Sequence, residues 1–230
     1  MILIEICHEF RNHMKGQSFR ILSESLYQIF ADRPDKVLLL GNVRLGAFDY
    51  DAILFCDSQI AVFEFKKGWG QIQIMKEGPW RKGYKKIWSG RDKQTRVQYE
   101  NPLVQMKVKR NVLYGYLKKH LNLQNDISCL ICFEGEVKVN DSYKILENKI
   151  SWLWITNRKS ACNKVLMSIL NDYKKENTIK NWDELLNTFH VRQTFSNGST
   201  ELTPNLLPCH EGFFRRLFWY LTRIIHLEAA

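Results

Sequence analysis

Two carboxylates face one another in a predicted β-hairpin. Residues 52–55 and 60–65 are apolar and rich in β-branched and aromatic side chains, and a short polar segment separates them, as in two strands joined by a turn. A turn centred after Asp57 places Asp51 directly opposite Glu64, at a Cβ separation of about 5 Å. Like charges at that distance repel each other, so we expect the fold to hold a cation between the two acids.

Lys66 adds a positive charge to this pair. It lies two residues beyond Glu64 in the same strand, and side chains at that spacing project from the same face. Two carboxylates, a divalent metal ion and an ammonium group on one face suit the hydrolysis of a phosphodiester bond. The alternative is that Asp51 and Glu64 are ordinary acids flanking the strands and that Lys66 and Lys67 are solvated at the strand end.

The apolar periodicity of the rest of the chain predicts a mixed α/β domain. Its order of elements gives a central mixed β-sheet flanked by helices. The expected elements are a helix at 19–30, strands at 37–40 and 43–48, the hairpin, a helix at 103–121, strands at 127–133 and 150–155, and a helix near 161–171.

The charge of the chain indicates an anionic partner. The formal net charge is +10, and most of it comes from a polar segment at 66–96. Such an excess favours nucleic acid or an anionic membrane surface. Tryptophans are interleaved with the basic residues and could stack on exposed bases, although they could equally anchor a long loop in the core. The candidate nucleic-acid-binding residues are Lys67, Trp69, Arg81, Lys82, Lys85, Lys86, Arg91, Lys93 and Arg96.

The composition predicts three regions along the chain. Residues 1–190 form the α/β domain, 191–210 read as a linker, and 211–230 form an amphipathic basic helix. This helix packs back on the domain or joins a fused or partner domain, and the alternative is a helix on a membrane surface. Because the sequence has neither a transmembrane-length apolar run nor a secretory leader, we expect a cytoplasmic protein.

Cys129 and Cys132 form a CxxC motif, which occurs in zinc and redox sites. They lie in an apolar run of strand length, and no second Cys or His pair with zinc-finger spacing exists in the sequence. We therefore expect both to be small buried hydrophobic residues.

The motifs around the hairpin resemble the nuclease-related domain family, which belongs to the PD-(D/E)xK, restriction-endonuclease-like superfamily. A D…ExK pattern alone is weak, but the order and spacing of the further motifs make the resemblance specific. It covers roughly residues 12–175. The matching features are Gly16 before the first helix, DYDAILF, VFEFKKGWGQI, Trp80, NPLVQ at 101–105, and ITNRKSACNKVLMSIL.

The resemblance implies a restriction-endonuclease-like core and a role for each matching residue. Asp51 and Glu64 look like the acids that bind Mg²⁺ or Mn²⁺, with the carbonyl of Phe65 as a further ligand. Lys66 looks like the lysine that orients water and stabilises the pentavalent phosphate. Gln105 looks like a polar residue that supports the site or contacts DNA.

One position departs from the family pattern. The family has a glutamate just after the first glycine, whereas here Gln17 follows Gly16. Glutamine keeps an oxygen ligand but loses the charge, which weakens a magnesium site. Glu24 lies nearly two helical turns further on, on the same helix face, and is the candidate substitute.

These observations predict a metal-dependent endonuclease that acts on DNA. The alternatives are a catalytically weak or inactive nucleic-acid-binding module on a nuclease scaffold, which Gln17 favours, and a membrane-associated adaptor that uses residues 211–230.

Overall fold

The computed structural model describes residues 2–30, 32–57, 59–87, 101–140, 150–157, 163, 166 and 179–191. The chain divides into two units, Met1–Thr200 and Glu201–Ala230, and all described residues belong to the first. The predicted C-terminal helix, the predicted linker after its first residue and nearly all of the helix predicted near 161–171 lie outside the described residues.

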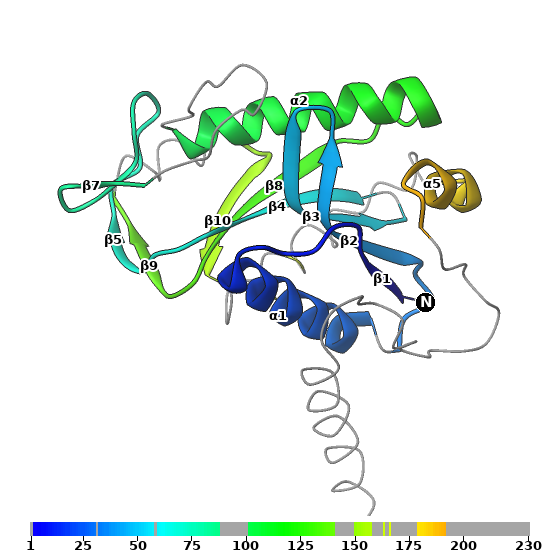
Figure 1. Cartoon of the computed structure of the whole chain (residues 1–230), viewed down its shortest axis with the longest axis horizontal. Coiled ribbons are helices and arrows are strands. Elements are labelled where there is room, and N and C mark those ends of the chain that lie inside the picture. Colours follow the sequence, from blue (N-terminus) through cyan, green and yellow to red (C-terminus); the bar gives the residue numbers. More distant parts are fainter. Residues whose placement is uncertain are drawn as a thin grey trace, which may run out of the picture. The chain divides into compact units, whose positions relative to one another are not determined.

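A mixed six-stranded sheet forms the centre of the fold (Figure 1). The middle strands β2, β3 and β4 are antiparallel neighbours, whereas β1 runs parallel to β2, and β4, β8 and β10 run parallel to one another. In order across the sheet the strands are β1 (Ile2–Ile6), β2 (Val37–Leu45), β3 (Phe48–Cys56), β4 (Gln59–Lys66), β8 (Ile127–Phe133) and β10 (Leu153–Asn157).

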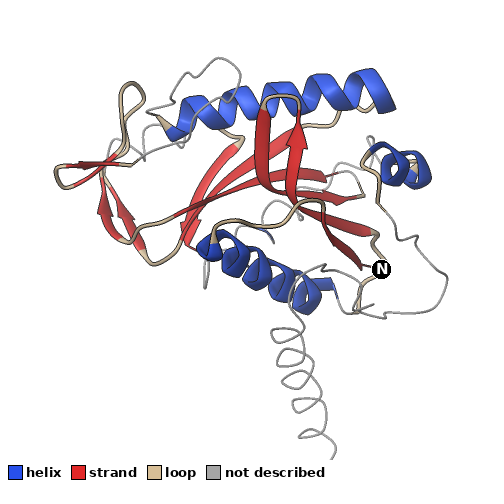
Figure 2. Ribbon diagram, in the orientation of Figure 1, coloured by secondary structure: helices blue, strands red, loops and turns tan. Residues whose placement is uncertain are grey.

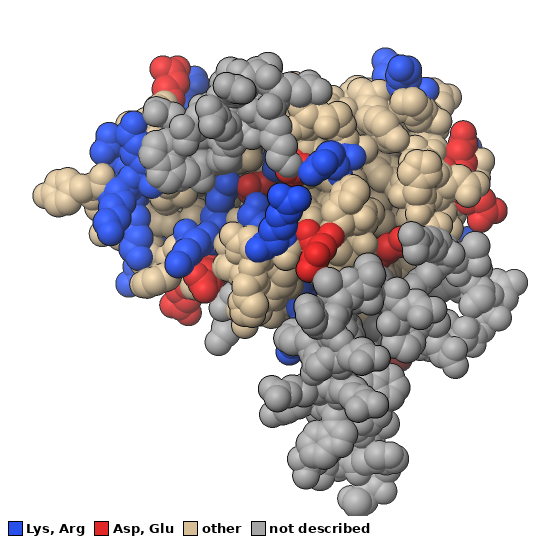
Figure 3. Space-filling view, viewed as in Figure 1, with Lys and Arg blue, Asp and Glu red and all other residues tan. Residues whose placement is uncertain are grey.

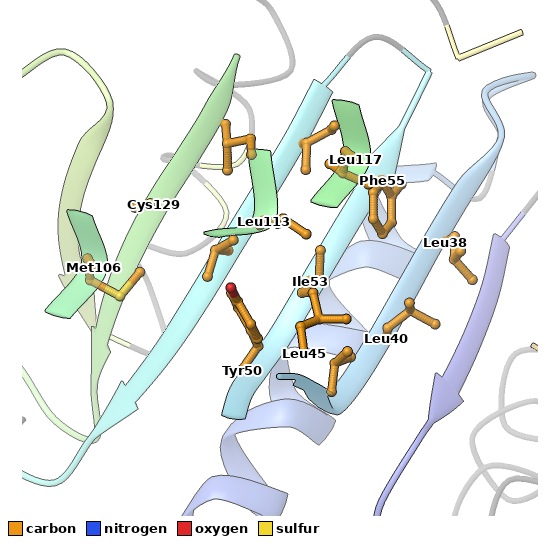
Figure 4. Close-up of a cluster of buried hydrophobic side chains, with 14 of the residues drawn as sticks. Leu38, Leu40, Leu45, Tyr50, Ile53, Phe55, Met106, Leu113, Leu117 and Cys129 are labelled. Atoms are coloured by element: carbon orange, nitrogen blue, oxygen red, sulfur yellow. The ribbon is translucent and has the colours of Figure 1, made fainter. Parts of the chain in front are cut away.

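Helices α1 (His13–Phe30) and α2 (Pro102–Leu121) lie on opposite faces of this sheet (Figures 1 and 2). On the α2 face, Leu113 and Leu117 pack towards Tyr50 and Phe55 in the main core (Figure 4). A short helix, α5 (Trp182–Thr188), adds Leu185 and other residues to this core. The α/β class with a mixed sheet flanked by helices is thus as the sequence predicted.

On the opposite face, α1 buries Phe19 and Leu22. Phe19 lies so close to β2 that a Cβ built on Gly41 would be 2.7 Å from its ring. A glycine at 41 therefore lets the helix approach the sheet. No helix in the described part of the chain is long and apolar enough to cross a membrane.

Helix α1 begins six residues before the predicted start at residue 19. Asn12 explains the difference, because its side chain accepts a 3.0 Å hydrogen bond from the N–H of Met14, as an N-cap does. Gly16 therefore lies inside the helix and not before it. The predicted strands at 37–40 and 43–48 are mainly one strand, β2, and the sequence reading did not include β1 or α5.

A smaller structure, here called the basic arm, continues from the central strands (Figure 1). It consists of β5 (Gly70–Ile72), β9 (Val137–Val139) and the hairpin of β6 (Arg81–Lys82) and β7 (Lys85–Lys86). Strand β5 pairs with β9 in the same parallel register in which β4 pairs with β8. The arm is therefore a direct extension of the two strands that carry the candidate site.

Candidate active site

The structure confirms the hairpin register that the sequence predicted. Cys56 pairs with Gln59 and Ala52 pairs with Phe63, so Asp51 and Glu64 come next to each other at the open end of the hairpin. The β3–β4 pairing ends there. The backbone N–H of Phe65 donates instead to Asp51 Oδ2 at 2.7 Å. Both carboxylates are almost completely buried, with 4% of Asp51 and 2% of Glu64 exposed.

The pairing of β2 with β3 is interrupted at Asp51. Strands β2 and β3 pair on either side of it, at Gly41–Ala52 and Val43–Tyr50, but the ladder omits Asn42 and Asp51. Asn42 has a φ of 48°. Its side-chain amide donates to the carbonyls of His8 and Glu9, at 2.9 and 2.7 Å. This local distortion of β2 therefore lies directly opposite Asp51.

Helix α1 contributes a cation that the sequence reading missed. Lys15 Nζ lies 2.6 Å from Asp51 Oδ1. The spacing from Lys15 to the buried residues Ser18, Phe19 and Leu22 places it on the inner helix face. That spacing was the available signal, but it depended on a helix that starts before residue 19.

Glu64 accepts hydrogen bonds from two buried lysines. Lys66 Nζ lies 2.8 Å from Oε1, and Lys109 Nζ lies 2.6 Å from Oε2. Lys66 also donates to Gln105 Oε1 at 3.1 Å, so the following helix brings Gln105 to this cluster. Lys109 was not predicted from the sequence, although it lies one helical turn beyond Gln105 and therefore shares its face.

The NPLVQ motif explains how α2 is held against the site. The Asn101 side chain accepts a 2.8 Å hydrogen bond from Leu103 N–H, and Pro102 occupies the first helical position, where its missing N–H costs nothing. One turn later the same helix presents Gln105 and then Lys109. Tyr50 fixes this face further, because its hydroxyl donates to the Lys109 carbonyl at 2.9 Å.

Burial and charge act differently on the two acids. Burial, together with the charge of Glu64, raises the pKa of Asp51. Burial would also raise the pKa of Glu64, but the ammonium groups of Lys109 and Lys66 outweigh it and lower that pKa. Burial lowers the pKa of Lys66, against the opposing effect of Glu64. Glu64 is therefore firmly ionised, whereas the charge of Asp51 depends on the cations beside it.

Two other metal-ligand candidates on α1 lie away from this cluster. Gln17 and Glu24 are exposed, and Glu24 forms a 2.9 Å ion pair with Arg20. At 100° per residue, both project from the side of the helix opposite Lys15. The structure does not bring Gln17 or Glu24 to Asp51 and Glu64. At Phe65 the predicted ligand is the backbone carbonyl, and the contact that the structure shows there is the hydrogen bond from the backbone N–H to Asp51.

The donor chemistry of the cluster fits a hard divalent cation. Mg²⁺ is commonly held by one or two carboxylates, with water and substrate phosphate completing its shell, and Asp51 and Glu64 supply two adjacent carboxylates. The described residues contain no group of three or more His, Cys, Asp or Glu that could hold a metal. Lys15, whose side chain is 31% exposed, would have to move away from Asp51 for a metal ion to bind there.

The basic arm brings many of the predicted nucleic-acid-binding residues to one region, and Figure 3 shows Lys and Arg gathered there. Lys67, Lys85 and Lys86 are exposed, Arg81 and Lys82 are partly exposed, and Trp69 is 54% exposed. Trp80 is fully buried and is a core anchor. Arg91, Lys93 and Arg96 lie outside the described residues.

The CxxC motif forms part of strand β8. Cys129 and Cys132 are both buried. Three residues apart in a strand, they project to opposite faces of the sheet. Burial raises the pKa of Cys129 to about 12. Their geometry agrees with the expected role as small hydrophobic residues.

Comparisons with known proteins identify the family of the chain. A family model described as nuclease-related domain matches residues 20–134, half of the chain. The chain therefore belongs to the nuclease-related domain family, as the resemblance predicted. None of the curated proteins matches it. Among solved structures it is similar to a repair endonuclease from Pyrococcus abyssi, at 11% identity and a TM-score of 0.33; the similarity covers 66% of this chain and 49% of that one, about half its length.

Proposed function

We propose that this protein is a divalent-metal-dependent endonuclease that hydrolyses phosphodiester bonds in DNA. The observation that carries the proposal is the buried cluster in which Asp51, Glu64 and Lys66 meet, in a chain of the nuclease-related domain family. The basic arm supports it, because it extends the strands that hold the cluster and presents basic side chains of the kind that neutralise phosphates.

In this proposal Asp51 and Glu64, with the carbonyl of Phe65, hold Mg²⁺ or Mn²⁺. The bound ion would polarise the scissile phosphate and lower the pKa of the attacking water. Lys66 contributes positive charge where the transition state gains negative charge. Gln105 fixes the Lys66 ammonium group through its 3.1 Å hydrogen bond, and Lys109 keeps Glu64 ionised.

A cleavage assay tests the proposal. Plasmid, linear duplex, single-stranded DNA and RNA are incubated with the protein in Mg²⁺, Mn²⁺ or EDTA. Wild type is compared with Glu64→Ala and with Asp183→Ala, which removes an exposed acid on α5. We expect metal-dependent cutting of DNA that Glu64→Ala reduces by at least about 100-fold, comparable to the loss of one transition-state donor. Unimpaired cleavage by Glu64→Ala would refute the site.

A second candidate function is a non-catalytic DNA-binding module. The observation that favours it is that lysines already neutralise both carboxylates, Lys15 at Asp51 and Lys109 with Lys66 at Glu64. It predicts DNA binding that weakens with salt, and no cutting with any metal. The third candidate, a membrane-associated adaptor, depends on residues 211–230, which lie outside the described residues. It predicts liposome binding that is lost when these residues are deleted.

A further inference from the structure

Tyr84 lies at the tip of the β6–β7 hairpin and is completely exposed, the most exposed of the large hydrophobic residues that the structure describes. Lys82 pairs with Lys85, so Gly83 and Tyr84 form the two-residue turn between them. Gly83, with a φ of 57°, supplies the left-handed first position that such turns favour. The turn does not require an aromatic residue at 84, because turns favour Gly, Pro, Asn, Asp and Ser.

The hairpin that carries Tyr84 is firmly attached to the arm. Trp80, at its base, is fully buried and donates from Nε1 to the Met75 carbonyl at 3.0 Å. Gln73 and Arg81 exchange two backbone hydrogen bonds, of 2.8 and 3.0 Å, and Ile87 N–H donates to the Trp80 carbonyl at 2.8 Å. Tyr84 therefore projects from an anchored support.

Cations and a second aromatic residue surround this tip. The two short strands consist of Arg81, Lys82, Lys85 and Lys86, so each side of Tyr84 carries positive charge. Lys82 Nζ lies 3.9 Å from the centre of the Trp69 ring. Trp69 is half exposed and packs against Gly135, where an added Cβ would lie 2.8 Å from Trp69 Cβ. The combination of anchored cations and exposed rings is that of a single-strand-binding surface, where lysines contact phosphates and rings stack on bases.

We propose that Tyr84 stacks on an unpaired base of DNA and that the β6–β7 hairpin is a finger that binds single-stranded DNA. This inference rests on the proposed function and specifies its substrate. In a duplex the bases are already stacked on one another, so an exposed ring gains little, whereas a single strand leaves base faces available. The finger therefore selects single-stranded or frayed DNA over intact duplex. Because β5 and β9 continue the register of β4 and β8, a strand held at the finger extends along the arm towards Lys66.

Equilibrium binding in EDTA tests this inference separately from cleavage. Fluorescence anisotropy measures the Kd of the full chain for a labelled single-stranded oligonucleotide and for the same sequence as a blunt duplex. The variants are Tyr84→Ala, Tyr84→Phe, which keeps the ring, and Tyr114→Ala, which removes a partly exposed tyrosine from α2. Far-UV circular dichroism and thermal melts check that each variant is folded.

We expect Tyr84→Ala to raise the Kd for the single strand roughly 5- to 150-fold, the range measured for aromatic residues that stack on bases. The Kd for the duplex should change much less, and Tyr84→Phe and Tyr114→Ala should bind like wild type. Equal weakening for single strand and duplex, or no change with either, overturns the role of Tyr84 even if the protein binds and cuts DNA. If wild type neither binds nor cuts DNA, the proposed function fails as well.

Discussion

Lys15 Nζ lies 2.6 Å from Oδ1 of Asp51, so helix α1 places an ammonium group on the carboxylate that the sequence assigns to a metal ion. Burial would lower the pKa of Lys15, but the charges of Asp51 and Glu64 outweigh it and raise that pKa, so this lysine stays protonated. A cation is present beside the two acids, as their repulsion requires, and it is part of the chain.

If Asp51 is a metal ligand, Lys15 competes with the metal. We expect Lys15→Met to lower the Kd for Mn²⁺ by at least about tenfold, because a unit charge about 4 Å from a divalent ion contributes ~2 kcal/mol even at the dielectric constant of water. Titration calorimetry without DNA measures this affinity. Lys15→Arg keeps the charge and should bind Mn²⁺ like wild type, and Lys107→Met, on the exposed face of α2, is the surface control. An unchanged or weaker Mn²⁺ affinity in Lys15→Met would contradict the competition.

Lys109 and Glu64 form a buried pair that a double-mutant cycle can isolate. Their 2.6 Å contact is 5% and 3% exposed at the two side chains. Lys109→Met removes one partner of a buried pair, a change that costs about 3–5 kcal/mol in other proteins, but Lys66 still contacts Glu64 and reduces the effect. Urea unfolding should therefore show a loss of roughly 2–4 kcal/mol.

The double variant Lys109→Met/Glu64→Gln supplies the fourth corner of this cycle. Glu64→Gln removes the carboxylate charge that Lys109 pairs with. The double variant should therefore lose less stability than the sum of the losses in Lys109→Met and Glu64→Gln. Strictly additive losses would mean that Lys109 contributes packing alone.

Asn101 connects the start of α2 to the basic arm, and two substitutions separate its functions. Its Oδ1 caps the helix, while its Nδ2 donates to the carbonyls of Met75 and Lys76 at 3.1 and 3.0 Å. Asn101→Asp keeps the cap and loses the donors, whereas Asn101→Ala loses both. We expect Asn101→Ala to cost about 1–2 kcal/mol more than Asn101→Asp in urea unfolding, since capping residues contribute about that much.

Hydrogen exchange then reports on the arm itself. Amides of the β6–β7 hairpin should exchange faster in both Asn101 variants, because both lose the bonds to Met75 and Lys76. Asn181→Ala, which removes the cap of α5, is the control and should leave the hairpin unchanged. Normal protection of the hairpin in Asn101→Asp would show that these bonds do not hold the arm.

The hairpin and Gln105 could be predicted from the sequence because their signals are local. Two apolar runs separated by a short polar turn fix which residues of the hairpin face each other, and the Asn-Pro pair of NPLVQ marks the start of a helix. These signals explain why four of the residues predicted for the site, Asp51, Glu64, Lys66 and Gln105, lie together in the structure. Local patterns do not determine which helix face meets which strand, so the cluster's other members, Lys15 and Lys109, were missed.

The short strands had weak signals for a different reason. The two-residue strands of the finger are too short for a period, and β1 is a short apolar run that Glu5 interrupts. The early start of α1 depends on one cap, Asn12. The polar residues after Asn12 hide that start from a search for apolar periodicity.

Buried thiols predict a loss of stability at alkaline pH. Burial, with the charge of Asp57, raises the pKa of Cys56 to about 12, and burial raises that of Cys129 to the same region. Unfolded thiols ionise near pH ~8.5. A thiol pKa that is higher in the folded than in the unfolded protein stabilises the fold at pH values below the unfolded pKa. This contribution is lost as the pH rises towards the folded pKa. The free energy of unfolding should therefore fall above pH ~8.5, by up to about 1.4 kcal/mol per pH unit for each thiol.

Cys56→Ala tests this pH dependence by removing one thiol. Urea unfolding between pH ~8.5 and ~10 should show a shallower fall in stability for this variant than for wild type. Native Cys129 should also react slowly with a thiol reagent at neutral pH and quickly in urea, because the thiolate is the reactive form. Equal slopes in the two proteins would show that Cys56 ionises alike in the folded and unfolded chains.

Two glycines should respond in opposite directions to the same substitution. Gly41→Ala puts a methyl group 2.7 Å from the Phe19 ring, so either α1 or the ring must shift. We expect it to cost about 1–3 kcal/mol, the usual cost of overpacking. Gly115, inside α2, has nothing within 4 Å of an added Cβ. Gly115→Ala should therefore stabilise the protein by about 0.5–1 kcal/mol through helix propensity.

Urea unfolding of both variants measures these changes, and Gly41→Ala/Phe19→Leu checks the cause. Leucine is smaller than phenylalanine and leaves room for the added methyl group, so the double variant should be more stable than the sum of the two single changes predicts. If Gly41→Ala is neutral, α1 does not pack against β2 as closely as the 2.7 Å approach requires. Since α1 also carries Lys15, a loosened helix in Gly41→Ala should weaken the Lys15–Asp51 contact and raise Mn²⁺ affinity, as we predict for Lys15→Met.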